Sequence, residues 1–150
     1  MFDLVILGGT VIDGSGKEGF CGDVGIEGEK ISAIGQFTPR MGHQAIQAEQ
    51  LIVAPGFIDP HTHSDFTILQ DPFAESKIRQ GVTTEIGGNC GFSVFPVNPA
   101  ILPAVKDYTR FFPGEISWNW TDYPGYLQEM GEKGIACNFG SHVGHGMIRI

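Results

Sequence analysis

Apolar and polar residues alternate in short runs over the first 55 residues of the chain. A period of two puts successive side chains on opposite faces, which is the pattern of strands with one face exposed to water. The runs at residues 23–27 and 30–34 flank Gly28-Glu29 and predict an antiparallel β-hairpin. Further strands are expected at residues 4–7, 10–13, 45–48 and 51–54, with a turn at Gly8-Gly9. A sheet this small buries too little apolar surface to be stable alone. We therefore expect residues 1–55 to be the N-terminal part of a small β-sandwich domain that is completed from elsewhere.

The pattern changes after Pro55-Gly56, and a second domain is expected over residues 56–150. Its first element is the apolar run 57–59, which predicts a buried strand. The β-branched stretch 81–87 predicts a second strand, and residues 134–140 predict a third.

Helices are predicted between these strands. Asp71-Pro72 combines a good N-cap residue with proline at the first helical position, which predicts a helix over residues 73–80 that ends before Gly81. Helical patterns also cover residues 99–109 and 123–131.

An alternation of strands and helices favours parallel strand pairing, and repeated units can close into a barrel. Eight units take about 250 residues, so this chain holds fewer than three of them. The expected fold class is α/β: the start of a (β/α)8 TIM barrel plus the N-terminal strands of a small β-sandwich. We expect the chain to be a fragment of a larger enzyme, with its first barrel units in residues 56–150.

Composition argues against several classes of partner. The formal charge is −8 and the nine Lys and Arg residues are scattered singly, so no basic stripe suits nucleic acid or anionic lipid. No apolar run approaches the length of a membrane span, and the N-terminus lacks the features of a secretory leader. Three widely spaced cysteines without a CxxC pair argue against a disulfide framework. These features predict a cytoplasmic protein.

The segment His61-Thr62-His63 carries the strongest chemical signal, at the end of the first predicted barrel strand. Because side chains alternate along a strand, the two histidines face the same way, with Cα atoms about 6–7 Å apart. That spacing lets both imidazoles bind one metal ion. A catalytic zinc site uses about three protein ligands and keeps one position open for water, so a third ligand is expected.

Cys90 is the candidate for that ligand. It lies in Gly87-Gly88-Asn89-Cys90-Gly91, directly after the second predicted strand, and the carboxyl ends of parallel strands meet at one edge of a sheet. The alternative is a buried free thiol that acts as a small hydrophobe. Asp65 either assists the site or caps the turn after the strand, and Glu85 faces either solvent or the helix layer.

Further polar residues follow the third predicted strand. His142 and His145 either contact the substrate or support the metal ligands, or they are surface loop histidines. Arg149 either binds a substrate carboxylate in a bidentate pair or is solvated at a helix start. The following residues are interpreted as structural: Trp118, Trp120, Cys21, Cys137 and His43.

With these residues identified, the chain resembles the N-terminal part of a metal-dependent amidohydrolase, and most closely the D-aminoacylase (N-acyl-D-amino-acid deacylase) branch. The resemblance covers nearly the whole chain, and the GFIDxHxHxD motif is characteristic of the superfamily. The added Gly-Asn-Cys-Gly narrows it to this branch. The segments that carry it are residues 3–14, 54–65, 81–86 and 88–93, and Gly144-His145-Gly146 with Arg149.

The resemblance implies a barrel with a β-sandwich built from both ends of the chain. It also implies one or two zinc ions held by His61 and His63, with Cys90 in place of the modified lysine of other members. The implied reaction is hydrolysis of a small-molecule N-acyl-D-amino acid to a carboxylate and a D-amino acid. Further histidine ligands and a catalytic aspartate are expected from later strands beyond residue 150, so no general base is assigned in this chain.

Three alternatives stay open or are set aside. A cyclic-amide hydrolase of the dihydroorotase or hydantoinase type shares the first motif, but such enzymes normally use a lysine on a later strand, which Gly-Asn-Cys-Gly argues against. A cupin-type metal-binding module also uses HxH, but Pro55, Thr67 and Ile68 occupy positions where it needs glycine and glutamate. A non-catalytic homologue would lack the downstream ligands.

Overall fold

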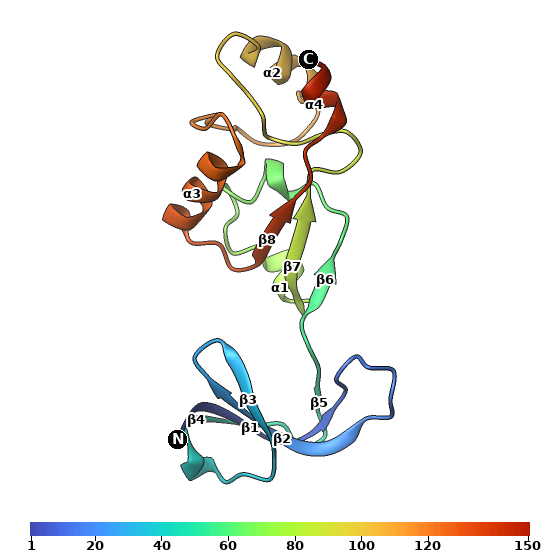
Figure 1. Cartoon of the computed structure of the whole chain (residues 1–150), viewed down its shortest axis with the longest axis vertical. Coiled ribbons are helices and arrows are strands. Elements are labelled where there is room, and N and C mark those ends of the chain that lie inside the picture. The colour runs from blue at the N-terminus through green and yellow to red at the C-terminus, as the bar shows by residue number, and fades with distance from the viewer. The chain divides into compact units, whose positions relative to one another are not determined.

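The computed structural model describes all residues, 1–150, and the chain divides into two compact units, Met1–Pro55 and Gly56–Ile150. Each unit contains its own β-sheet (Figure 1). No helix in either unit combines the length and the apolar character that crossing a membrane requires.

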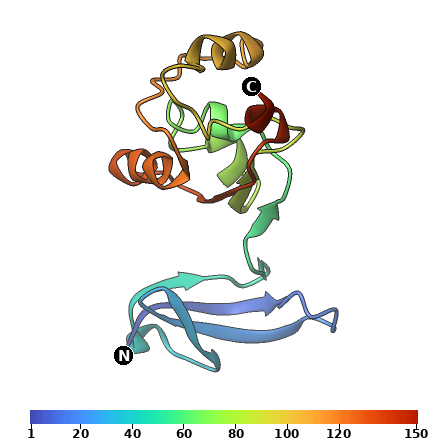
Figure 2. The ribbon, with the colours of Figure 1, turned by 45° about the horizontal axis from the view of Figure 1, so that its top comes forward.

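The first unit is a single five-stranded sheet, whose strands lie side by side in Figures 1 and 2. Its elements are β1 (Phe2–Val11), β2 (Phe20–Glu27), β3 (Lys30–Gly35), the 3-10 helix η1 (Pro39–Met41), β4 (Gly42–Gln47) and β5 (Ile52–Val53). The order is β3-β2-β1-β4, with β5 also paired to β1. The predicted hairpin is confirmed, because β2 and β3 are antiparallel with Glu27 opposite Lys30. One sheet is not a sandwich, so the expected β-sandwich stays a prediction.

The turn predicted at Gly8-Gly9 is wrong, because both residues lie inside β1. The pairing of β1 with β2 continues past them with a shift of register between Ile6 and Gly9. Gly8 has φ +72° and donates its N–H to Asp23 Oδ1 at 2.7 Å. A bulge of this kind redirects a strand without ending its pairing, and glycine takes the positive φ that it requires.

The second unit contains a three-stranded parallel sheet in the order β6-β7-β8, which confirms the parallel pairing expected from the strand and helix alternation. Its strands are β6 (Phe57–Asp59), β7 (Val82–Gly87) and β8 (Asn138–Ser141). The third strand starts four residues later than predicted. Ala136 donates its N–H to the carbonyl of Pro72 at 2.8 Å, so this stretch is bonded to a loop instead of to β7.

The helices of this unit are η2 (Ser64–Phe66), α1 (Glu75–Ile78), α2 (Leu102–Tyr108), α3 (Tyr123–Lys133) and α4 (His145–Arg149). α2 and α3 match the predicted helical stretches, while α4 was not predicted. α1 is much shorter than predicted and Asp71 does not cap it. Ala74, which is buried, has φ +44°, and this left-handed residue separates the turn closed by Asp71 from the helix.

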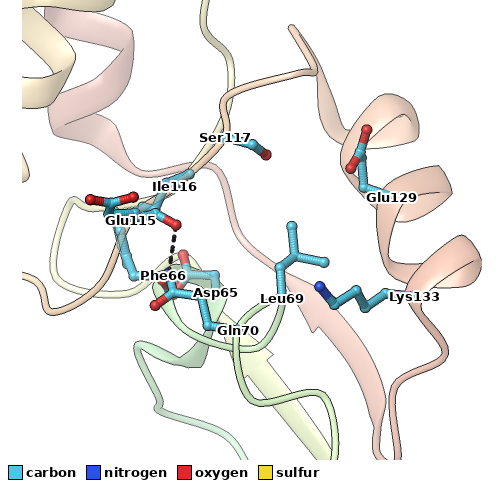
Figure 3. Close-up of a pocket in the computed structure, with 9 residues that line it drawn as sticks. All are labelled: Asp65, Phe66, Leu69, Gln70, Glu115, Ile116, Ser117, Glu129 and Lys133. Carbon is cyan, nitrogen blue, oxygen red and sulfur yellow. Dashed lines mark hydrogen bonds between the residues drawn. The ribbon is translucent and has the colours of Figure 1, made fainter.

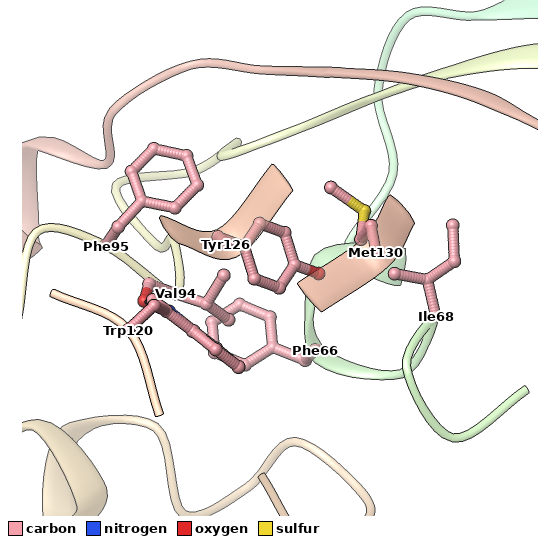
Figure 4. Packing of buried hydrophobic residues seen from close by; sticks show 7 residues of the cluster. All are labelled: Phe66, Ile68, Val94, Phe95, Trp120, Tyr126 and Met130. Atoms are coloured by element: carbon pink, nitrogen blue, oxygen red, sulfur yellow. The ribbon is translucent and has the colours of Figure 1, made fainter. Parts of the chain in front are cut away.

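The main hydrophobic cluster packs α3 and the long loop before it against η2 and the segment after β7. Its buried members are Phe66, Ile68, Val94, Phe95, Trp120, Tyr126 and Met130 (Figure 4). Two hydrogen bonds to backbone carbonyls satisfy its polar atoms: Tyr126 Oη donates to Asp65 at 2.7 Å, and Trp120 Nε1 donates to Val94 at 2.7 Å. The interpretation of Trp120 as a packing residue is confirmed.

Expressed by itself, the polypeptide of residues 1–150 should self-associate. Parallel sheets are normally covered on both faces, yet Phe57 and Ile58 are each 64% exposed on the edge strand β6. Sedimentation velocity is expected to show oligomers or aggregates. A monodisperse monomer with a cooperative melting transition would contradict this expectation.

Candidate metal centre

His61, His63 and Cys90 are brought together by the structure at the carboxyl ends of β6 and β7. His61 Nε2 lies 3.1 Å from Cys90 Sγ, and one potential ligand atom from each of the three residues lies within 4.8 Å of the others. A tetrahedral zinc ion with bonds of about 2.0–2.3 Å separates its ligand atoms by roughly 3.3–3.8 Å. Small side-chain rotations therefore suffice to bring all three atoms onto one ion.

Backbone hydrogen bonding to β7 continues into the histidine segment after β6 ends at Asp59. Thr62 donates its N–H to the carbonyl of Ile86 in β7 at 3.2 Å, so the segment still runs alongside that strand. The strand conformation itself has ended by His63, which has φ −117° and ψ 23°, yet the ligand atoms of both histidines still converge with that of Cys90.

A tight turn after β7 brings Cys90 back toward the histidines. Gly88 has φ +73°, and a Cβ there would lie 1.9 Å from the carbonyl oxygen of His142, so only glycine fits. Cys90 itself has φ +54°, which costs energy for any residue except glycine and is typical of functional sites. The thiol is exposed, so the alternative interpretation of a buried free cysteine is wrong.

The environment of His63 favours its neutral form. Two effects lower the pKa of the His63 imidazole: the larger is desolvation by burial, and the smaller is the charge of the nearby His61. Its ring lies 5.2 Å from that of Phe112 and 6.3 Å from that of Phe92, measured between centroids. Since a metal binds only the neutral imidazole, this apolar packing prepares His63 as a ligand at neutral pH.

The types of the three candidate ligand atoms fit a zinc ion. Two imidazoles and a thiol are zinc ligands by preference, and three of them leave a coordination position free. His63 Nδ1 is buried without any hydrogen-bond partner in the chain. An unpaired buried nitrogen costs about 1–3 kcal/mol, so this ring has unused capacity for a metal ion or an outer partner.

Asp65 supports the turn that carries Cys90. It is 3% exposed, its Oδ2 accepts the N–H of Gly88 at 3.3 Å, and burial raises its pKa to about 7. It caps neither η2 nor its own turn, so the capping interpretation is wrong.

Asp65 also lines a pocket of about 230 Å³ that none of the three ligand candidates reaches (Figure 3). In that pocket Gln70 Nε2 donates to the carbonyl of Glu115 at 3.0 Å.

An ionic group beside the histidines, built around the buried carboxylate of Glu85, was missed in the sequence. Lys77 of α1 forms ion pairs with Asp59 and with Glu85, the latter at 3.4 Å. Glu85 is 0% exposed and faces the helix layer, so its solvent-facing interpretation is wrong. The hydrogen bond with Lys77 lowers the pKa of Asp59, and the same bond raises that of Lys77. Charges this far apart in the sequence carry no local signal, since only the strand pairing brings them together.

The candidates after β8 lie near the turn of Cys90 but outside the ligand cluster. His142 donates its N–H to the carbonyl of Gly87 at 3.1 Å and extends the β7–β8 pairing. His145 begins α4, which is tied to that turn because Gly146 donates its N–H to the carbonyl of Gly91 at 2.9 Å. Arg149 ends α4, so its alternative interpretation as a residue at a helix start is wrong. The side chains of His142, His145 and Arg149 are all exposed.

Comparisons with known proteins find similar sequences and similar structures. The model of a family described as the amidohydrolase family matches residues 44–148. A D-aminoacylase of Alcaligenes xylosoxydans xylosoxydans is 39% identical over 148 residues, which cover 99% of this chain and 30% of the relative. The chain therefore spans about a third of the length of the curated relatives that it matches.

The solved structures that are similar over 99% of the chain include the following two. One is a D-aminoacylase with a binuclear metal centre. Its TM-score is 0.83, its sequence identity is 36%, and 31% of its own chain is covered. The other is the N-acyl-D-glutamate deacylase of Bordetella bronchiseptica in complex with zinc and a phosphonate inhibitor, with a TM-score of 0.81, 33% identity and 30% of its chain covered.

Replacing the candidate ligands should remove metal from the complete protein that carries this chain. We expect His61→Ala and Cys90→Ala to lower bound zinc well below the wild-type stoichiometry, because each removes one of only three converging donors. Metal content after dialysis is measured by atomic emission spectrometry.

His43→Ala and Cys21→Ala are the matched controls, since both residues are exposed and lie outside the cluster. They should keep the wild-type stoichiometry. Equal zinc content in all four variants would rule out the assignment.

Proposed function

The chain belongs to the amidohydrolase family, and on that premise we propose that it supplies the first metal ligands of a zinc-dependent hydrolase of N-acyl-D-amino acids. The products are a carboxylate and a free D-amino acid. The observation that carries this proposal is the convergence of two imidazoles and a thiol within 4.8 Å at the carboxyl ends of two parallel strands. In barrels of this class, catalytic groups lie at that end of the strands.

The domain organisation proposed for the complete protein follows from the two units. Gly56–Ile150 is taken as the first βα units of a (β/α)8 barrel, because its three strands are parallel and carry the ligand candidates at one end. Met1–Pro55 is taken as the N-terminal part of a β-sandwich that strands from outside this chain complete.

In this mechanism the residues of this chain bind the metal ion and orient its ligands. When bound, zinc supplies a Lewis acid for the amide carbonyl and a source of nucleophilic water at neutral pH. His61, His63 and Cys90 would hold the ion, and the rings packed on His63 favour the neutral form of that imidazole by desolvating it. The general base that takes the proton of water and passes it to the leaving amine is an aspartate outside residues 1–150.

The substrate class is supported by two observations. The similar proteins include a D-aminoacylase and an N-acyl-D-glutamate deacylase, and both are similar over 99% of this chain. The exposed groups on α4 offer a site for the substrate carboxylate, since Arg149 can form a bidentate pair and His145 lies on the same short helix.

The complete protein should hydrolyse N-acetyl-D-amino acids and leave the L enantiomers intact. Removal of metal by a chelator should abolish the activity, and added zinc should restore it, because the ion activates both water and carbonyl. Cys90→Ala should lower kcat/KM by at least about 100-fold, since outer-shell changes alone cost 10–100-fold. Release of the free amino acid is followed by chiral chromatography.

A panel of D-Met, D-Glu and D-Asp derivatives separates the side-chain preferences. Dihydrouracil and a substituted hydantoin test for cyclic-amide hydrolysis. Faster turnover of the cyclic amides, or full activity after metal removal, would overturn the proposed function.

A further inference from the structure

Thr62, the residue between the two histidines, is held at every polar atom. Its N–H donates to the carbonyl of Ile86 at 3.2 Å, and its own carbonyl accepts Asn89 Nδ2 at 3.1 Å. Its Oγ1 accepts the N–H of Ser64 at 3.2 Å and the ammonium of Lys77 at 3.4 Å. Thr62 is only 7% exposed, so these partners replace water. The backbone on either side of Thr62 sets the directions of His61 and His63.

Lys77 joins this residue to the start of the histidine segment. Besides Thr62 Oγ1, its ammonium binds Asp59 Oδ2 and pairs with Glu85 Oε1 at 3.4 Å. The other carboxylate oxygen of Asp59 accepts the N–H of His61 at 3.2 Å. One ammonium thus reaches the backbone of His61 through Asp59 and the backbone of Thr62 through its hydroxyl.

Glu85 holds the ammonium from the strand side. Its Oε2 accepts the hydroxyl of Ser64 at 3.0 Å, and its Oε1 has no contact except the ion pair with Lys77. A carboxylate buried this completely is expensive, and well-packed apolar residues usually stabilise a protein equally well or better. The best-attested use of a buried ionic group is to fix a register, which is what the metal ligands require here.

We propose that Lys77 and Glu85 are positioning residues of the metal centre, which fix the directions of His61 and His63 through Asp59 and Thr62. The inference deepens the proposed function and rests on its metal site, but not on its substrate. Supporting groups around metal ligands orient them before the metal arrives, and their loss costs about 10–100-fold in metal affinity.

The test uses the complete protein in its metal-free form and four substitutions, one of which is a control. Thr62→Val removes the hydroxyl at nearly constant shape, and Thr62→Ser restores it. Lys77→Met removes the ammonium. Arg79→Met is the matched control, because Arg79 also lies next to α1 and loses the same charge, but its only ion pair is the exposed one with Glu75 at 3.1 Å.

The zinc Kd is measured by competition with a chromophoric chelator, and the visible absorption of the cobalt(II)-substituted protein reports ligand geometry. We expect Thr62→Val and Lys77→Met to weaken zinc binding about 10–100-fold and to alter the cobalt bands. Thr62→Ser should recover most of the affinity, and Arg79→Met should stay within about twofold of the wild type, because outer-shell losses act only through groups bonded to the ligands.

Circular dichroism melting of the metal-free proteins separates positioning from stability. If Lys77→Met fails to fold, Thr62→Val decides alone, since it keeps both ion pairs of Lys77. A folded Thr62→Val protein with wild-type Kd and cobalt spectrum would overturn the proposal, as would equal losses in Thr62→Val and Thr62→Ser. A wild-type protein that shows these metal effects but does not hydrolyse N-acyl-D-amino acids would refute only the proposed function.

Discussion

The larger unit depends on the parallel pairing of β6 with β7, which continues through Thr62 after β6 itself has ended. The hydrogen bond from Thr62 to Ile86 keeps the histidine segment in register with β7 at the point where that strand turns. Asn89 bonds to the same two residues, at 2.7 Å to the Ile86 carbonyl and 3.1 Å to that of Thr62. The two loops that bear the ligand candidates are therefore one hydrogen-bonded assembly, and Cys90 reaches His61 because of it.

Two different environments meet at the histidine pair. On one side lie Asp59 of β6, Lys77 of α1 and Glu85 of β7, a charged group that supplies directional bonds. On the other side lie the aromatic rings of Phe92 and Phe112, which desolvate His63. Directional bonds orient a metal ligand, and an apolar surface keeps it unprotonated. The site obtains both properties from short-range contacts within one unit.

The turn after β7 uses left-handed backbone conformations. Gly88, Cys90 and Gly91 all have positive φ values, of +73°, +54° and +86°. Such a turn persists only where surrounding contacts stabilise it. Here Asp65 accepts the N–H of Gly88, and the start of α4 is bonded to the carbonyl of Gly91. The third strand and its helix thus support a ligand that they do not themselves provide.

The sequence alone was sufficient for features that depend on neighbouring residues. The alternation around Gly28-Glu29 predicted the hairpin, and the spacing of His61 and His63 after an apolar strand predicted two side chains on one face. Only the tertiary structure decided where element boundaries differ from those that local sequence patterns predict. A bulge kept β1 continuous, the left-handed backbone of Ala74 delayed α1, and a bond to Pro72 delayed β8. It also decided that Lys77 meets the buried Glu85, because an ion pair between a helix and a strand exists only once the two elements pack together. Periodicity records what each residue prefers along its own segment, whereas these outcomes depend on partners that the fold alone brings within reach.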